Sequence, residues 1–518
     1  MTTKENTSIH LYTHKSIEHS QDLECDVCIV GSGAGGGTLA AGLVEQGLDV
    51  IVLESGQHRW RKDFDMNEAK ALQELYQEGG LRTTEDLAIS IMQGHNVGGG
   101  TTINWTTCFR TPERILKKWK ERHGVHLSVE DMIPHWEAVE KRLNIHKWHE
   151  PLVNENNRVI LNGCEKLGWE SSIISRNVKG CLNSGFCGMG CPADAKQGML
   201  VTYIPDALRK GLRLYTDVRA TRFESSLEQV EYLHATVWNP EKKRPTSKKL
   251  KIRAKSFVSS AGAINGPALF LRSGINDHGL VGKRTFFHPV VGIAAKFEHE
   301  INGFYGAPQS ASSHQFVEEE EEIGFFLEAA PTHPILAATA ASKFGASQQN
   351  FMSQLSHMSF LLALHVDGYA DGDDGGQVSL HDDGRIRIDY PISPKLQRSF
   401  LRSHKALFEL ALAAGSTRVN SLHLHPTVAT NSSEISALEN QEYGALHHGI
   451  FTAHQMGGLP MGRDATMGVV NDQYRHHRLK NLFVVDGSIF PTSLGVNPSL
   501  TIYGLAHRAR QFVGDSVG

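Results

Sequence analysis

The chain has 518 residues, of which 40% are hydrophobic and 21% are charged, and its formal net charge is −4 at pH 7. No run of about 18 apolar residues occurs, which argues against a membrane-spanning helix, and the charge gives no basic footprint for nucleic acid. This length predicts two to four domains, or one large domain with insertions, able to bury a large cofactor.

Residues 1–23 are polar, carry charges of both signs and lack the apolar stretch of a secretory signal. We therefore expect a polar N-terminal tail over residues 1–23 and a cytoplasmic protein, either free or peripheral to a membrane. The seven cysteines are an odd number in a long chain, so reduced thiols are expected rather than a disulfide framework.

A strand, a helix and a second strand follow the tail. Residues 27–30 and 50–53 are short apolar runs typical of buried parallel strands, and residues 38–46 have the spacing of a helix. Together they predict a βαβ unit.

The first turn of this unit predicts a dinucleotide site. Gly31, Gly33 and Gly36 match G-x-G-x-x-G, which lets the backbone turn tightly and approach a pyrophosphate at the helix N-terminus. Glu54 ends the second strand, where a carboxylate can bind a ribose hydroxyl. At this point the motif fits both NAD and FAD.

A second glycine cluster lies at residues 94–104 and includes Gly98, Gly99 and Gly100. A further loop that exposes backbone so soon after the first suits a long cofactor whose far end also needs close contact with the main chain. This cluster favours FAD.

Three cysteines stand together in a glycine-rich segment. Cys181, Cys187 and Cys191 have the spacing C-x5-C-x3-C-P, which suits an iron–sulfur centre with three thiolate ligands. A fourth cysteine is absent nearby, which argues against a closed zinc site. Buried structural thiols are the favoured interpretation, and an iron–sulfur cluster is the alternative.

Residues 291–445 carry no cofactor motif. Apolar, strand-like segments at 290–297, 359–366, 376–380 and 385–392 are separated by turn residues and predict an antiparallel sheet.

The C-terminal region predicts a strand at 482–485, a turn at Asp486 and Gly487, and a helix over 498–510 that Asn497 could cap. A carboxylate at the end of a strand, beside a helix N-terminus, lies where open α/β sheets bind ligands, so Asp486 is expected to contact the cofactor. Upstream, His454 stands in "TAHQMGGLPMG", ahead of two glycines expected to leave room beside the imidazole.

These motifs together resemble the glucose–methanol–choline (GMC) family of flavin oxidoreductases. The resemblance rests on the N-terminal fingerprint, "GHNVGGGTTIN" as the first family signature, "SAGAINGPALFLRSGI" as the second, and the C-terminal block. Two positions of the second signature depart from the family pattern, Gly266 and Asn276.

The resemblance implies an α/β fold: a Rossmann-type FAD-binding domain, discontinuous in sequence, and a substrate domain with an antiparallel sheet covered by helices. Residues 24–290 and 446–518 would form the FAD-binding domain, with an insertion at 111–200 that carries the cysteine segment. Residues 291–445 would form the substrate domain.

The resemblance also implies roles for single residues. FAD, expected to be non-covalent, would lie along Gly98, Gly99, Gly100 and Asn104, with Val218 contacting adenine through its main chain and Asp486 and Gly487 near the ribityl and flavin region. His454 and Asn497, forty-three residues apart, match the catalytic pair. His454 would be the base, with a pKa near the working pH, and Asn497 would hold the alcohol oxygen. Glu328 is a further candidate for the pocket.

The sequence therefore predicts FAD-dependent oxidation of an alcohol, of apolar or long-chain type, by hydride transfer to flavin N5. The small-molecule alcohol would pass its electrons to oxygen, a quinone or a redox protein, and no nucleic acid partner is expected. One alternative is a sugar or polyol dehydrogenase that passes electrons through an iron–sulfur cluster. An alternative of another class is a non-redox lyase or photoenzyme on the same flavin scaffold.

Overall fold

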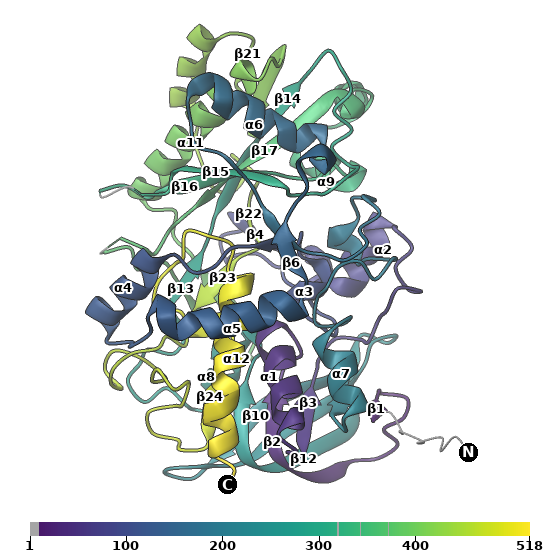
Figure 1. Cartoon of the computed structure of the whole chain (residues 1–518), viewed down its shortest axis with the longest axis vertical. Helices are drawn as coiled ribbons and strands as arrows, with labels where there is room; N and C mark the ends of the chain where they lie inside the picture. Colours follow the sequence, from purple (N-terminus) through teal and green to yellow (C-terminus); the bar gives the residue numbers. More distant parts are fainter. Residues whose placement is uncertain (1–9, 319–320, 342, 371) are drawn as a thin grey trace.

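The computed structural model describes residues 10–318, 321–341, 343–370 and 372–518. Two large sheets lie at opposite ends of the elongated molecule, and helices cover both of them (Figure 1).

The lower sheet in Figure 1 has eight strands in the order β1-β9-β3-β2-β12-β11-β10, with β24 paired to β12. Pairing is parallel from β1 to β12 and between β12 and β24, and antiparallel across β12, β11 and β10. The strands are β1 (Leu11–Tyr12), β2 (Gln21–Val30), β3 (Val50–Leu53), β9 (Arg213–Tyr215), β10 (Val218–Ser225), β11 (Val230–Asn239), β12 (Arg244–Ser259) and β24 (Leu482–Val484).

The predicted βαβ unit forms the centre of this sheet. Strand β3 matches the prediction, whereas β2 starts six residues before the predicted 27. Its polar first half gives no apolar run, and it is a strand because it pairs with β12, more than 200 residues away. Helix α1 (Ala34–Glu45) starts before the predicted 38, since its glycine-rich first turn shows no apolar spacing.

Helix α1 belongs to a group of helices that packs beside this sheet. Helix α1 packs against α7 (Tyr203–Arg209) and α12 (Ser499–Asp515), and α12 in turn packs against α5 (Val129–Arg142) (Figure 1).

The upper sheet has nine strands in the order β21-β20-β14-β17-β16-β15-β7, with β22 paired to both β14 and β4. Helices α6 (Glu155–Leu167) and α11 (Pro394–Ala413) pack on each other and on these strands (Figure 1). The strands are β4 (Ile89–Ile91), β7 (Ser172–Ile173), β14 (Val290–Lys296), β15 (Ala311–Phe316), β16 (Phe325–Ala329), β17 (Met358–His365), β20 (Arg418–Ser421), β21 (Val428–Ala429) and β22 (Ile450–Thr452).

The four predicted strand segments divide between two sheets. The first two become β14 and β17 and pair antiparallel in the upper sheet, as expected. The last two become β18 (Gly376–Leu380) and β19 (Ile386–Asp389), which belong to a separate four-stranded sheet with β13 (Lys283–Phe287) and β23 (Gln455–Gly457). Sequence patterns give strands but not their partners, because the partners are distant in the chain.

The domain boundaries stay a proposal. Strands β4 and β7 come from before residue 291 and still join the upper sheet, so the two parts of the chain interlock there. In the predicted tail, residues 1–9 lie outside the described residues, and β1 and the start of β2 belong to the lower sheet. Among the described residues, no helix has both the length and the apolar character needed to cross a membrane.

Replacing Gly31 by alanine is expected to destabilise the fold far more than the same change at Gly47. Both glycines have positive φ, +99° and +83°, so both variants carry similar backbone strain. A Cβ on Gly31 would stand 2.2 Å from the Ser260 carbonyl oxygen, whereas nothing lies within 4 Å of one on Gly47. We expect Gly31→Ala to lower the free energy of unfolding by about 1–3 kcal/mol more than Gly47→Ala does, and denaturant unfolding measures the difference. Equal losses for the two variants would contradict this packing.

Candidate active site

One cavity of about 1150 Å³ connects the two ends of the predicted site. It starts at the first glycine turn and reaches His454 and Asn497. Every predicted cofactor or catalytic residue lines it except Gly36 and Gly98. The lining residues among those predicted are Gly31, Gly33, Glu54, Gly99, Gly100, Asn104, Val218, His454, Asp486, Gly487 and Asn497.

Gly36 and Gly98 do not line the cavity, but both support the glycine loops that do. A Cβ on Gly36 would stand 2.0 Å from the Gly31 carbonyl oxygen, so Gly36 lets α1 pack directly on the turn. Gly98 has φ +90°, and its N–H donates to Ser32 Oγ at 3.1 Å. A Cβ on Gly33 would lie 3.9 Å from the Gly99 Cα. The two glycine loops therefore meet, and both leave their backbone open toward a cofactor.

Glu54 is held in place by its own neighbours. One carboxylate oxygen accepts hydrogen bonds from the Ser32 N–H (3.0 Å) and hydroxyl (2.6 Å), and the other accepts from the Gly56 N–H (2.8 Å). Burial raises the pKa of Glu54, and these hydrogen bonds oppose that rise. The carboxylate thus ties the first glycine turn to the end of β3 while it faces the cavity.

Asp486 joins the end of β24 to the start of α8 (Gly262–Arg272). Its carboxylate accepts from the N–H groups of Gly262 (2.7 Å) and Ser488 (2.8 Å). Burial raises the pKa of Asp486. Val218 also lines the cavity, but its N–H already donates to the Glu54 carbonyl oxygen at 2.9 Å.

His454 lies between β22 and β23, and a chain of hydrogen bonds fixes its ring. The Asn497 amide donates to His454 Nε2 at 3.4 Å, and His454 Nδ1 contacts His288 Nδ1 at 2.9 Å. His288 Nε2 in turn lies 2.9 Å from Ser493 Oγ. Because an amide N–H can only donate, the His454 proton belongs on Nδ1, and the Nε2 lone pair remains toward Asn497.

Burial lowers the pKa of His454 to about 4, below the expected value near working pH. The difference arises because the surrounding protein removes water from the partly buried imidazole, which disfavours the charged form. At neutral pH the ring is therefore uncharged and able to accept a proton. His288 was missed by sequence reasoning: it follows β13 in "FFHP", and nothing local marks it as a partner of His454.

Asn497 does not cap a helix, contrary to the prediction. Helix α12 begins at Ser499 with Pro498 at the N-cap position, without a side-chain cap bond. The Asn497 side chain instead faces His454 and Glu328, donating to Glu328 Oε2 at 3.4 Å. Tertiary contacts offered it partners that the local helix signal could not show.

Glu328, on β16, is fully buried at the same end of the cavity. It accepts from Gln309 Nε2 at 2.6 Å, and burial raises its pKa to about 8. The second oxygen of Glu328 and the side-chain oxygen of Asn497 are buried without a hydrogen-bond partner. Such unpaired atoms are costly in a native protein unless a further group satisfies them.

Gly457 and Gly458 do not open space beside the imidazole, contrary to expectation. A Cβ on Gly457 would stand 2.0 Å from the Arg284 carbonyl oxygen, and one on Gly458 would stand 2.7 Å from Pro267. Neither glycine lines the cavity. They allow β23 to pack closely on β13 and α8.

The three clustered cysteines line one small pocket together. Cys187 contacts Arg176, and Cys181 contacts Asn183. In the described parts of the chain, the one group of three His, Cys, Asp or Glu side chains close enough to share a single metal ion consists of histidines. An iron–sulfur cluster ligated by Cys181, Cys187 and Cys191 stays a prediction, and structural thiols stay the favoured interpretation.

Comparisons with known proteins place the chain in a family. Two family models described as GMC oxidoreductase match residues 72–290 and 373–506. The Arabidopsis thaliana long-chain-alcohol oxidase FAO4A is 30% identical over 94% of this chain and 68% of its own length. FAO4B from the same plant is 29% identical over 96% of this chain and 68% of its own length.

This chain belongs to the GMC oxidoreductase family. The assignment confirms the predicted enzyme class, an FAD-dependent alcohol dehydrogenase or oxidase, and the predicted α/β fold. Among solved structures, pyridoxine 4-oxidase from Mesorbium loti has a TM-score of 0.70 at 18% identity, over 94% of this chain and 98% of that one. A formate oxidase has a TM-score of 0.69 at 12% identity, over 95% and 98%. These likenesses show the shared fold.

The raised pKa of Glu328 makes a testable difference to stability. Between its ordinary pKa of 4.5 and about 8, the folded enzyme keeps the proton that the unfolded chain releases. The contribution of Glu328 to the free energy of unfolding is therefore fully present below pH 4.5 and is lost as the pH rises toward 8. Relative to Glu328→Gln, the wild type should lose about 2–5 kcal/mol of unfolding free energy over that range.

Denaturant unfolding of both proteins at a series of pH values measures this difference. Glu137→Gln, at an exposed position, is the matched control and should follow the wild type. Parallel pH profiles for the wild type and Glu328→Gln would contradict the buried, protonated carboxyl.

Proposed function

We propose that this GMC enzyme oxidises the hydroxyl group of a largely apolar alcohol at the end of the cavity where His454, Asn497 and Glu328 converge. The observation that carries the proposal is the 3.4 Å approach of Asn497 Nδ2 to His454 Nε2 inside that cavity. The unpaired oxygens of Asn497 and Glu328 lie in the same group of residues, which suits a polar substrate atom among buried partners.

The residues that line the cavity fit FAD. The two open glycine loops and Glu54 suit the dinucleotide part, and Asn104, Asp486 and Gly487 line the same cavity as His454. When bound, the flavin supplies the acceptor, N5, for a hydride from the carbinol carbon.

His454 would take the proton from the substrate hydroxyl. Its neutral imidazole has a lone pair on Nε2, and the contact with His288 holds the ring and its tautomer. Asn497 would orient the same oxygen and stabilise the negative charge that develops on it. Glu328 is protonated at neutral pH, so it would position Asn497 and the substrate as a neutral hydrogen-bonding group.

The preference for an apolar alcohol rests on two supports. The relatives FAO4A and FAO4B are named long-chain-alcohol oxidases. In addition, Val290, Leu362, Leu364 and Phe451 contribute apolar wall to the same cavity. Oxygen is the proposed electron acceptor, because these relatives are named oxidases. A quinone or a redox protein remains the alternative acceptor, and the cytoplasmic location remains a prediction.

Replacing His454 by glutamine is expected to lower kcat/KM by about 100- to 10,000-fold, because a glutamine cannot take the proton. The FAD content of the purified variant should stay at the wild-type level. His126→Gln, at an exposed position, is the control and should keep full activity. A His454→Gln variant with full flavin content and unchanged kcat/KM would overturn the assigned base.

A series of straight-chain primary alcohols should reduce the flavin without oxygen, and kcat/KM should rise with chain length. Each added CH₂ that enters the apolar wall contributes about 0.8 kcal/mol, or about fourfold. Stopped-flow bleaching measures flavin reduction, and hydrogen peroxide release on readmitting air measures the use of oxygen. A spectrum that no alcohol changes would favour the lyase or photoenzyme alternative.

A further inference from the structure

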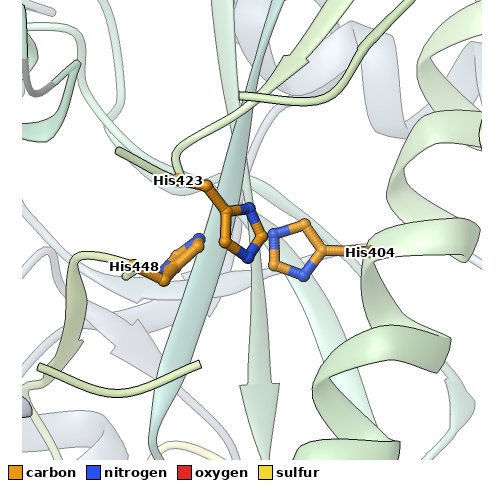
Figure 2. A group of neighbouring side chains, drawn as sticks. All are labelled: His404, His423 and His448. Atoms are coloured by element: carbon orange, nitrogen blue, oxygen red, sulfur yellow. The ribbon is translucent and has the colours of Figure 1, made fainter. Parts of the chain in front are cut away.

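Three histidines that the proposed reaction does not use form a cluster in the upper sheet. His404 comes from α11, His423 follows β20 and His448 precedes β22. One ring nitrogen from each side chain lies within 4.8 Å of the other two, and Figure 2 shows the three rings turned toward one another. All three residues are buried, with exposed fractions of 0%, 2% and 5%.

The cluster is poorly satisfied by the protein alone. Neither ring nitrogen of His423 or of His448 has a partner within hydrogen-bond geometry, and His404 Nε2 also lacks one. Unpaired buried polar atoms are rare because each loses its hydration without compensation. One ring nitrogen from each of the three histidines converges here, which indicates a group that accepts lone pairs at this point.

His404 is oriented as a metal ligand. Its Nδ1 lies 3.0 Å from the Phe400 carbonyl oxygen and 3.0 Å from the Tyr443 hydroxyl. Because a carbonyl only accepts, the Phe400 contact places the proton on Nδ1 and leaves the Nε2 lone pair for the cluster. Metal-bound histidines typically donate their second ring N–H to a backbone carbonyl in this way.

The place in the fold also suits a bound ion. Strand β14 pairs with β20 from Ile293 onward and with β22 at Val290, so the segment around Gly292 lies between the two pairings. His423 and His448 come from the ends of β20 and β22 that flank this break, and they face each other across an isolated bridge. An ion here would join β20, β22 and α11.

We propose that His404, His423 and His448 bind one first-row transition metal ion, with Zn²⁺ as the best fit. Three imidazoles without a carboxylate or thiolate exclude Mg²⁺ and Ca²⁺, which prefer oxygen, and suit Zn²⁺ with a fourth position for water. Zinc–nitrogen bonds of about 2.0–2.1 Å place the ligand atoms roughly 3.3 Å apart, so small side-chain rotations close the site. None of the three histidines lines the cofactor cavity, so the ion would be structural.

The test measures zinc in the full-length FAD-bound enzyme, purified without a histidine tag. After dialysis with ZnCl₂ and then metal-free buffer, the wild type should retain about one zinc per chain by mass spectrometry. His423→Gln should retain roughly tenfold less or lower still. The control variants His425→Gln and His447→Gln are exposed neighbours of two ligands and should match the wild type.

Two further measurements test the metal–nitrogen bonds and the stabilisation of the fold by zinc. The zinc absorption edge of the wild type should show nitrogen neighbours at about 2.0–2.1 Å. Added ZnCl₂ should raise the Tm of the metal-depleted wild type but leave that of His423→Gln unchanged. If His423→Gln does not fold, His448→Gln takes its place. A metal-free wild type, or equal zinc in the wild type and the folded ligand variants, would overturn the proposal.

Discussion

The close approach of backbone to backbone at the first glycine turn is the contact on which the site depends. Side chains would not fit there: a Cβ on Gly31 would meet the Ser260 carbonyl and one on Gly35 would meet the Val485 carbonyl at 1.9 Å. This packing brings the end of β2 against the ends of β12 and β24, which lie far away in the sequence. Asp486 follows β24 directly, and the chain then leads to Asn497 at the other end of the cavity.

The upper sheet supplies the second condition, which is desolvation of the ionisable groups. Glu328 on β16 is fully buried and His454 after β22 is partly buried, and desolvation moves their pKa values in opposite directions, to about 8 and about 4. Desolvation disfavours the charged form of each group, so the acid keeps its proton and the base stays without one. This end of the cavity thus presents a hydrogen-bond donor and an acceptor without a permanent charge on either group.

The same sheet connects the histidine cluster to the active site. Strand β22 runs from the segment of His448 to the segment of His454, and it pairs with both β14 and β4. An ion bound by the cluster would hold one end of this short strand, and the contact with His288 holds the residue beyond its other end. Few backbone hydrogen bonds link β22 to its neighbours, so side-chain anchors have much to contribute to the position of His454.

The sequence by itself determined the features that arise from local pattern, which are the βαβ unit and the glycine turns, while the resemblance to the GMC family singled out His454 and Asn497. Apolar spacing and glycine positions reflect the conformations and contacts of residues that are near one another in the chain, so the sequence alone reveals them. The tertiary structure alone decided that Asn497 faces Glu328 rather than capping α12, that His288 supports His454, and that the strands at 376–389 leave the upper sheet. It also decided that His404, His423 and His448 converge. The physical reason is that hydrogen-bond partners and burial are set by residues distant in the chain, and the same side chain changes role with the neighbours that folding brings to it.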